Sequence, residues 1–69
     1  MYRYEVILYW SSADGCFLAE VPELPGCMAD GETMQQALEA AQTVIEEWIE
    51  TAQKLGREIP QPKGKLKYA

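Results

Sequence analysis

The sequence predicts an α+β fold, in which one long amphipathic helix packs on one face of a three-stranded antiparallel sheet. Two patterns predict it: strand-like alternation before residue 31, and apolar residues at helical spacing from about Thr33 to Leu55. The 69 residues have room for a single domain, residues 1–69. A domain of this size is marginally stable alone, so we expect some apolar surface to lie in a homo-oligomer interface, in a dimer or a larger assembly.

The first 30 residues have the pattern of three strands. Alternation from Tyr2 to Trp10 predicts the first strand, and Asp-Gly within residues 11–15 predicts a hairpin to a second strand at Cys16–Val21. Two prolines within Pro22–Gly26 take the chain out of the sheet, because proline cannot donate a ladder hydrogen bond. Cys27–Asp30 predicts a short third strand. The apolar face of the first strand would hold Tyr2, Tyr4, Val6, Leu8 and Trp10.

The predicted helix has signals at both of its ends. Thr33 fits the N-cap position, and Gln36 completes a Thr-x-x-Gln capping box. Gly56 fits the position after the last turn, where a left-handed conformation ends a helix. Between these signals one apolar stripe faces the sheet, made of Met34, Ala37, Leu38, Ala41, Val44, Ile45, Trp48, Ala52 and Leu55.

The segment after the helix is extended and ends in basic residues. Pro60 and Pro62 favour an extended path. Lys63–Tyr68 alternates lysine with other residues, which is typical either of a short C-terminal edge strand or of a frayed tail. The pattern alone does not choose between the two.

Charge divides the chain into an acidic body and a basic end. Residues 1–60 hold all eleven acidic residues against Arg3, Lys54 and Arg57, a net charge of −8, whereas residues 61–69 carry +3. An acidic body repels phosphate groups and attracts basic proteins, so we expect no direct nucleic-acid binding. The plainer interpretation is that the acidic residues keep a small protein in solution.

The residue types present exclude most catalytic chemistry. The chain has no histidine, so Cys16 and Cys27 lack a histidine base, and two thiols alone cannot complete a zinc site. We therefore predict no enzyme activity, no metal and no cofactor. The cysteines are expected to be reduced, unbridged thiols of a cytoplasmic protein, with Cys27 buried. Arg3 and Glu5 lie within the N-terminal strand, so we expect no signal peptide. No apolar run approaches the roughly 18 residues that a membrane span needs, so we expect no membrane span.

Aromatic and acidic side chains are the candidates for binding a partner. Trp48, at the centre of the helix stripe, is expected in the core, whereas Trp10 either caps the core or lies in an interface. Acids on the second strand, the following turn and the helix would attract a basic protein. The candidate partner-binding residues are therefore Trp10, Glu20, Glu23, Glu46, Glu47 and Glu50.

The order of these motifs resembles the HicB family of antitoxins, in particular its short, UPF0150-type members without a DNA-binding domain. The residues that carry the resemblance are Asp14-Gly15, Phe17, Ala19, Val21-Pro22-Glu23-Leu24-Pro25-Gly26-Cys27, Gly31-Glu32-Thr33, Ala37-Leu38, Ala41, Trp48, Gly56, and Ile59-Pro60 with Pro62. The Leu-Pro-Gly-Cys turn followed by Gly-Glu-Thr is the most specific part, because physical chemistry alone requires only some turn and some cap at these positions.

The resemblance implies a partial RNase H-like fold of strand–strand–strand–helix–strand order without nuclease activity. It also implies a partner, a HicA-like toxin that is a small basic ribonuclease and degrades mRNA. Antitoxins of this family bind the toxin, cover its active site and form dimers or larger assemblies. Longer members add a DNA-binding domain, whose motifs do not appear among these 69 residues, so promoter binding is not carried over.

Our hypothesis is that this chain is the antitoxin of a type II toxin–antitoxin system. One alternative is an orphan, homo-oligomeric HicB-like interaction module without a toxin, which a gene neighbourhood lacking a small basic reading frame would favour. The other is a residual metal-dependent nuclease that uses Glu5 and Glu20 with helix acids. This alternative is disfavoured because the helix acids face away from the apolar stripe. Calorimetry with Mg²⁺ or Mn²⁺ would decide it.

Overall fold

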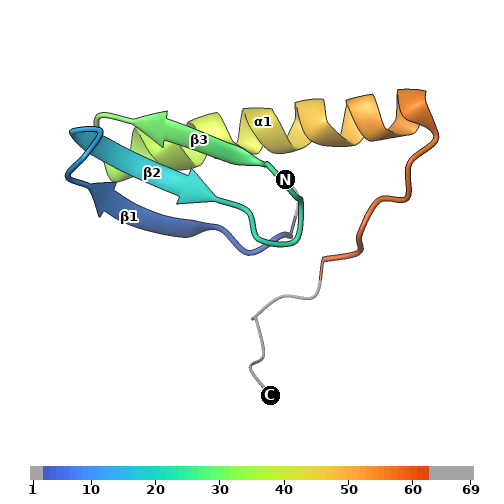
Figure 1. Ribbon diagram of the computed structural model, residues 1–69, viewed down its shortest axis with the longest axis horizontal. Coiled ribbons are helices and arrows are strands. Elements are labelled where there is room, and N and C mark those ends of the chain that lie inside the picture. The colour runs from blue at the N-terminus through green and yellow to red at the C-terminus, as the bar shows by residue number, and fades with distance from the viewer. Residues whose placement is uncertain (1–2, 63–69) are drawn as a thin grey trace, which may run out of the picture.

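The computed structural model describes residues 3–62 and has the predicted α+β architecture. Strands β1 (Ile7–Ser11), β2 (Cys16–Glu20) and β3 (Met28–Gly31) precede helix α1 (Met34–Leu55). The sheet has the order β1-β2-β3 with both pairs antiparallel. Figure 1 shows α1 lying beside β3, with β1 farthest from the helix. The C-terminal strand or tail predicted at Lys63–Tyr68 lies outside the described residues.

The strands are shorter than predicted or shifted along the chain. β1 begins at Ile7, so residues 3–6 of the predicted strand lie before it, and Tyr2 lies outside the described residues. The strand starts there because β2 ends at Glu20, which is the partner of Ile7 in the ladder. The next residue, Val21, has left that ladder, and its N–H donates instead to the carbonyl of Cys27 at 3.0 Å. β3 accordingly runs from Met28 to Gly31, one residue later than predicted.

The register of the sheet gives it two different faces. Leu8, Ala19 and Ala29 form one cross-strand row that packs against the helix, and we call this side the inner face. The opposite side, which we call the outer face, carries two rows. These rows are Ile7–Glu20–Met28 and Tyr9–Leu18–Asp30.

The ends of α1 match their predicted signals, with one difference. Thr33 is the N-cap, and its hydroxyl oxygen accepts from the N–H of Gln36 at 3.1 Å. The side-chain oxygen of Gln36 accepts from the N–H of Glu32, one residue before the cap, so the reciprocal half of the capping box is displaced. Gly56 ends the helix in the left-handed conformation at φ 69°, as predicted.

The helix is longer than the sheet that it covers. Twenty-two residues of helix extend over about 33 Å, whereas a five-residue strand extends over about 17 Å. The prediction that Met34 and Leu55 face the sheet is wrong, because these residues at the two ends of α1 are 51% and 62% exposed. Ile49 was absent from the predicted stripe but is buried, four residues after Ile45.

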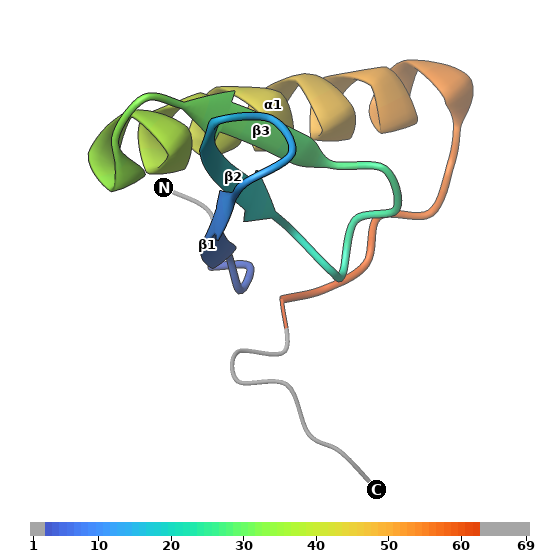
Figure 2. The same cartoon turned by 60° about the vertical axis from the view of Figure 1, so that its left-hand side comes forward.

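The helix approaches the sheet most closely at its first turns. Ala37 and Ala41 pack directly on Ala19, so small side chains fill this part of the interface. Figure 2 shows the start of the helix passing over β3. At Gly31 the approach is so close that a Cβ atom would lie 2.4 Å from the backbone nitrogen of Ala37.

Larger side chains fill the core under the second half of the helix. There, the loop between β2 and β3 and the chain after α1 replace the sheet as the packing partners. The indole N–H of Trp48 donates to the carbonyl of Pro25 at 3.0 Å, and the hydroxyl of Tyr4 donates to the carbonyl of Pro60. Trp48 packs against this core, as predicted, although it is only half-buried. The buried members are Tyr4, Val21, Leu24, Cys27, Ile45 and Ile49.

Candidate protein-binding surface

The acidic candidates are divided between the two opposite sides of the molecule. Glu46, Glu47 and Glu50 are exposed on α1, away from its buried stripe. Glu20 lies on the outer face of the sheet, and Glu23 is half-buried in the loop that follows β2. The structure therefore does not bring the predicted acidic residues together in one patch.

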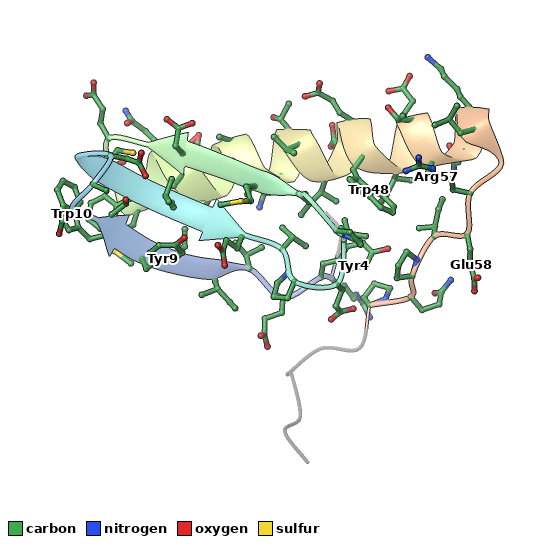
Figure 3. All side chains as sticks on the ribbon, in the orientation of Figure 1. Tyr4, Tyr9, Trp10, Trp48, Arg57 and Glu58 are labelled. Atoms are coloured by element: carbon green, nitrogen blue, oxygen red, sulfur yellow. The ribbon has the colours of Figure 1, made fainter. Side chains whose placement is uncertain are left out.

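Trp10 lies at the hairpin end of the sheet, far from the second tryptophan. Figure 3 shows Trp10 at one end of the molecule and Trp48 toward the other. The Trp10 ring stands edge-on to Phe17, with ring centroids 5.1 Å apart and an angle of 73° between the planes. It remains 52% exposed. Trp10 therefore packs against Phe17 and also exposes a large part of its aromatic ring at the hairpin end of the sheet.

The helix acids are exposed on the surface of α1. The ion pair between Glu50 and Lys54 has a separation of 3.9 Å, and both side chains are more than two-thirds exposed. Exposed pairs of this kind contribute between zero and about 1 kcal/mol and are screened by salt. This side of α1 can attract a basic protein from a distance. Its apolar part is a hollow of about 290 Å³ that Glu47 borders with Val44 and Trp48, and Arg57 places a positive charge in that hollow.

The outer face of the sheet is the apolar surface that the fold leaves uncovered. No helix, strand or loop within residues 3–62 packs over its centre, and Ile7, Tyr9 and Met28 are 37%, 37% and 47% exposed. Leu18, between them on the central strand, is half-buried. A clustered apolar surface of this kind commonly marks a binding site.

Acidic groups surround this apolar surface. The Tyr9 hydroxyl donates to the carboxylate of Glu20 at 2.9 Å. That hydrogen bond, followed by partial burial and then by the charges of Glu20 and Asp14, raises the pKa of Tyr9. On the other side, Asp14 and Asp30 border an open hollow of about 460 Å³ whose remaining lining is Cys16, Leu18, Met28 and Ala29.

The pKa of Cys16, which lines this hollow, depends in part on the nearby carboxylates. Partial burial, and then the charges of Asp30 and Asp14, raise the pKa of its thiol. The folded state holds the proton of this thiol more strongly than the unfolded chain does. The protonated thiol therefore contributes to stability at pH values below the ordinary pKa of cysteine. That contribution is lost as the pH rises through the raised value.

Asp30→Asn is expected to speed the alkylation of Cys16 by about twofold at a fixed pH near 8, because thiolate is the reactive form and one repelling charge is removed. Iodoacetamide labelling followed by peptide mass spectrometry measures this rate. Cys27 is the internal control, because it is buried and burial is the cause that raises its pKa. An unchanged Cys16 rate would show that Asp30 does not act on the thiol.

Both cysteines are free thiols, as predicted. Among residues 3–62, no three Cys, Asp or Glu side chains are grouped so that they could hold a metal ion. Within the same residues, no helix has the length and apolar character needed to cross a membrane.

The comparison with known protein families agrees with the extent of this fold. The model of the UPF0150-like family matches residues 3–60, which include all three strands and the helix. The chain belongs to the UPF0150-like family. No solved structure matches it significantly.

Two relatives show how far the similarity extends for this UPF0150-like chain. UPF0150 protein ssl0259 of Synechocystis sp. is 41% identical over 58 residues, which are 84% of this chain and 78% of that protein. UPF0150 protein Ta0767 of Thermoplasma acidophilum is 36% identical over 58 residues, which are 84% of this chain and 83% of that protein. The chain is thus similar to a bacterial and an archaeal protein over most of their lengths.

Proposed function

We propose that this UPF0150-like protein is a HicB-type antitoxin of a type II toxin–antitoxin pair. It binds a small basic HicA-like toxin that cleaves mRNA, and it covers the active site of that toxin. The pair acts in the cytoplasm, and the fold belongs with the partial RNase H-like domains that have no nuclease activity. The observation that carries the proposal is the combination of an acidic body with an uncovered apolar sheet face.

Charge supports the choice of a basic partner. Residues 1–60 carry a net charge of −8, and a field of that sign accelerates association with a cationic protein. A ribonuclease needs cationic groups to hold its RNA, so an acidic protein on that surface competes directly with the substrate. Inhibition by occlusion therefore requires no catalytic residue in the antitoxin.

A binding and inhibition experiment tests the proposal. The full chain is mixed with the HicA-like protein encoded in the same genome, and complex formation and cleavage of an mRNA substrate are both measured. We expect a complex at about 50 mM salt, loss of cleavage at equimolar antitoxin, and an association rate that falls at least about fivefold at 500 mM salt. Failure to bind at low ionic strength contradicts the proposal.

The alternative of an orphan homo-oligomer has one observation in its favour, because the uncovered outer face could also pack on a second copy. Light scattering of the purified chain distinguishes the two functions. Self-association through this face, combined with no binding to a HicA-like protein, favours the homo-oligomeric module. If the chain does not self-associate through this face, or dissociates from a second copy to bind the HicA-like protein, the antitoxin function is favoured.

A further inference from the structure

We propose that the outer face of the sheet is the surface that receives the basic partner. A lysine or arginine side chain of the partner lies in the hollow beside β2 and β3, with its charged end between Asp14 and Asp30. Its aliphatic part lies on Leu18 and Met28. This inference rests on the proposed function for the identity of the partner, and it adds the surface and the chemistry of recognition.

The apolar part of the hollow fits the stem of a long cationic side chain. Leu18 is on the central strand, and Met28 is on β3 one row away, so the two form a continuous floor. Met28 is 47% exposed, which leaves area for a partner to cover. Lysine and arginine bury their methylene groups on such surfaces while their charged ends remain near water. Methionine is also suited to the task, because it adapts its shape to a partner.

The charged part of the hollow fits the end of the same side chain. Asp14 is fixed by the hairpin turn, where its carboxylate accepts from the Ser11 hydroxyl at 2.7 Å. Asp30 is exposed on β3 and borders the hollow from the other side. Cys16 lines the same hollow, and its thiol pKa is raised first by partial burial and then by the charges of Asp30 and Asp14. A cation placed there would relieve this repulsion.

Charge also argues against other occupants of the face. Phosphate groups of nucleic acid and anionic lipid headgroups are repelled by Asp14, Glu20 and Asp30. A second copy placed face to face would bring the same three carboxylates of each chain together. The same carboxylates attract a basic protein, whereas they repel nucleic acid, anionic lipid and a second copy. The observations therefore favour a basic protein as the occupant.

The acidic side of α1 is the competing surface for a basic partner. It differs from the outer face in the apolar side chains that lie beside its acids. Glu46, Glu47 and Glu50 project from an exposed polar surface. A cationic side chain beside Glu46 or Glu50 would gain only a screened ion pair. Glu47 borders a hollow with Val44 and Trp48, but Arg57 lines the same hollow and would repel a cation. The helix acids can therefore speed the encounter without being the place where the partner docks.

Two double variants separate these surfaces. The first combines Asp14→Asn with Asp30→Asn, and the second combines Glu46→Gln with Glu47→Gln. Both change the net charge by the same amount, the first on the outer face and the second on α1. We expect the first pair to weaken binding of the HicA-like protein by about fivefold or more and the second by less than about twofold. Met28→Ala is expected to weaken binding by at least about threefold. Met34→Ala, at a similarly exposed methionine at the start of α1, is expected to leave binding unchanged.

Amide NMR spectra of the nitrogen-15-labelled full chain locate the contact directly. The probes are a catalytically inactive HicA-like protein and, separately, a short peptide that alternates lysine and leucine. We expect both to shift the signals of Cys16, Leu18 and Asp30, and to protect Cys16 from alkylation. A peptide with glutamate in place of lysine is expected to do neither.

The outcomes distinguish this inference from the function on which it rests. Binding of the HicA-like protein with shifts confined to the helix acids, or with equal losses in the two double variants, overturns the outer face while leaving the antitoxin function. Lysine-peptide shifts on the outer face without any toxin complex support the surface and contradict the function. Shifts on the same face that depend only on the concentration of this chain assign it to a second copy, which overturns the basic partner.

Discussion

Replacing Gly31 with alanine is expected to lower the free energy of unfolding by about 2 to 3 kcal/mol, a large part of the stability of a small domain. The added Cβ would lie 2.4 Å from the nitrogen of Ala37 and 2.8 Å from the carbonyl carbon of Gln36. Carbon atoms in normal contact are about 3.5 Å or more apart. Both neighbours belong to the helix backbone, so the whole first turn of α1 must move.

Two opposing effects decide the sign of this change. Gly31 has no positive φ, and glycine-to-alanine changes at such positions stabilise by about 0.4 to 1 kcal/mol because they restrict the unfolded chain. The backbone clash outweighs that gain unless the helix can shift cheaply. A Gly31→Ala variant as stable as the wild type would show that the helix does shift.

Urea unfolding followed by circular dichroism measures the effect of Gly31→Ala. Asp30→Ala is the matched control, because it introduces the same residue one position earlier on an exposed site of the same strand. We expect this control to change the free energy of unfolding by less than about 0.5 kcal/mol. The difference between the two variants isolates the contact with the helix.

Local signals made the helix and the strand order predictable. Thr33 and Gly56 mark helix ends through conformations that few other residues favour, and both positions are as predicted. The alternation of apolar residues likewise placed Leu8 on the face of the first strand that meets the helix. These features depend on neighbours in sequence, so a single chain reveals them.

Features that depend on contacts between distant segments were not predictable. Gly31 lies just after the predicted third strand, but it is the last residue of β3 and the point of closest approach to α1. The outer face was equally hidden, because it needs the register of three strands to bring Tyr9, Leu18 and Met28 together. Sequence alone located acids, but it could not indicate which of them border apolar surface.

The loop between β2 and β3 shows the same limit. Its prolines predicted only that the chain leaves the sheet, yet Leu24 within it is a central core residue with 1% exposure. The loop is held by its own hydrogen bonds, in which Leu24 donates to Val21 at 3.1 Å and Cys27 donates to Leu24 at 3.0 Å. These bonds place the loop under the second half of the helix as a fixed part of the core.

Leu24→Ala is therefore expected to lower the free energy of unfolding by about 3 kcal/mol. The leucine side chain packs in the cluster that contains Ile45 and Ile49. The hydrogen-bonded loop cannot easily collapse into the space left behind, so the variant loses both the burial of the side chain and the packing around it. Urea unfolding measures the change, with the fluorescence of Trp48 as a local probe, since its indole is bonded to Pro25 in the same loop.

Leu55→Ala is the control for this substitution, because it removes the same atoms from a side chain that is 62% exposed at the end of α1. We expect it to change the free energy of unfolding by less than about 1 kcal/mol. If the two variants lose equal stability, the loop yields to fill the space and is not a rigid part of the core. If Leu24→Ala alone is strongly destabilised, the loop with two prolines supports the helix where the sheet no longer reaches it.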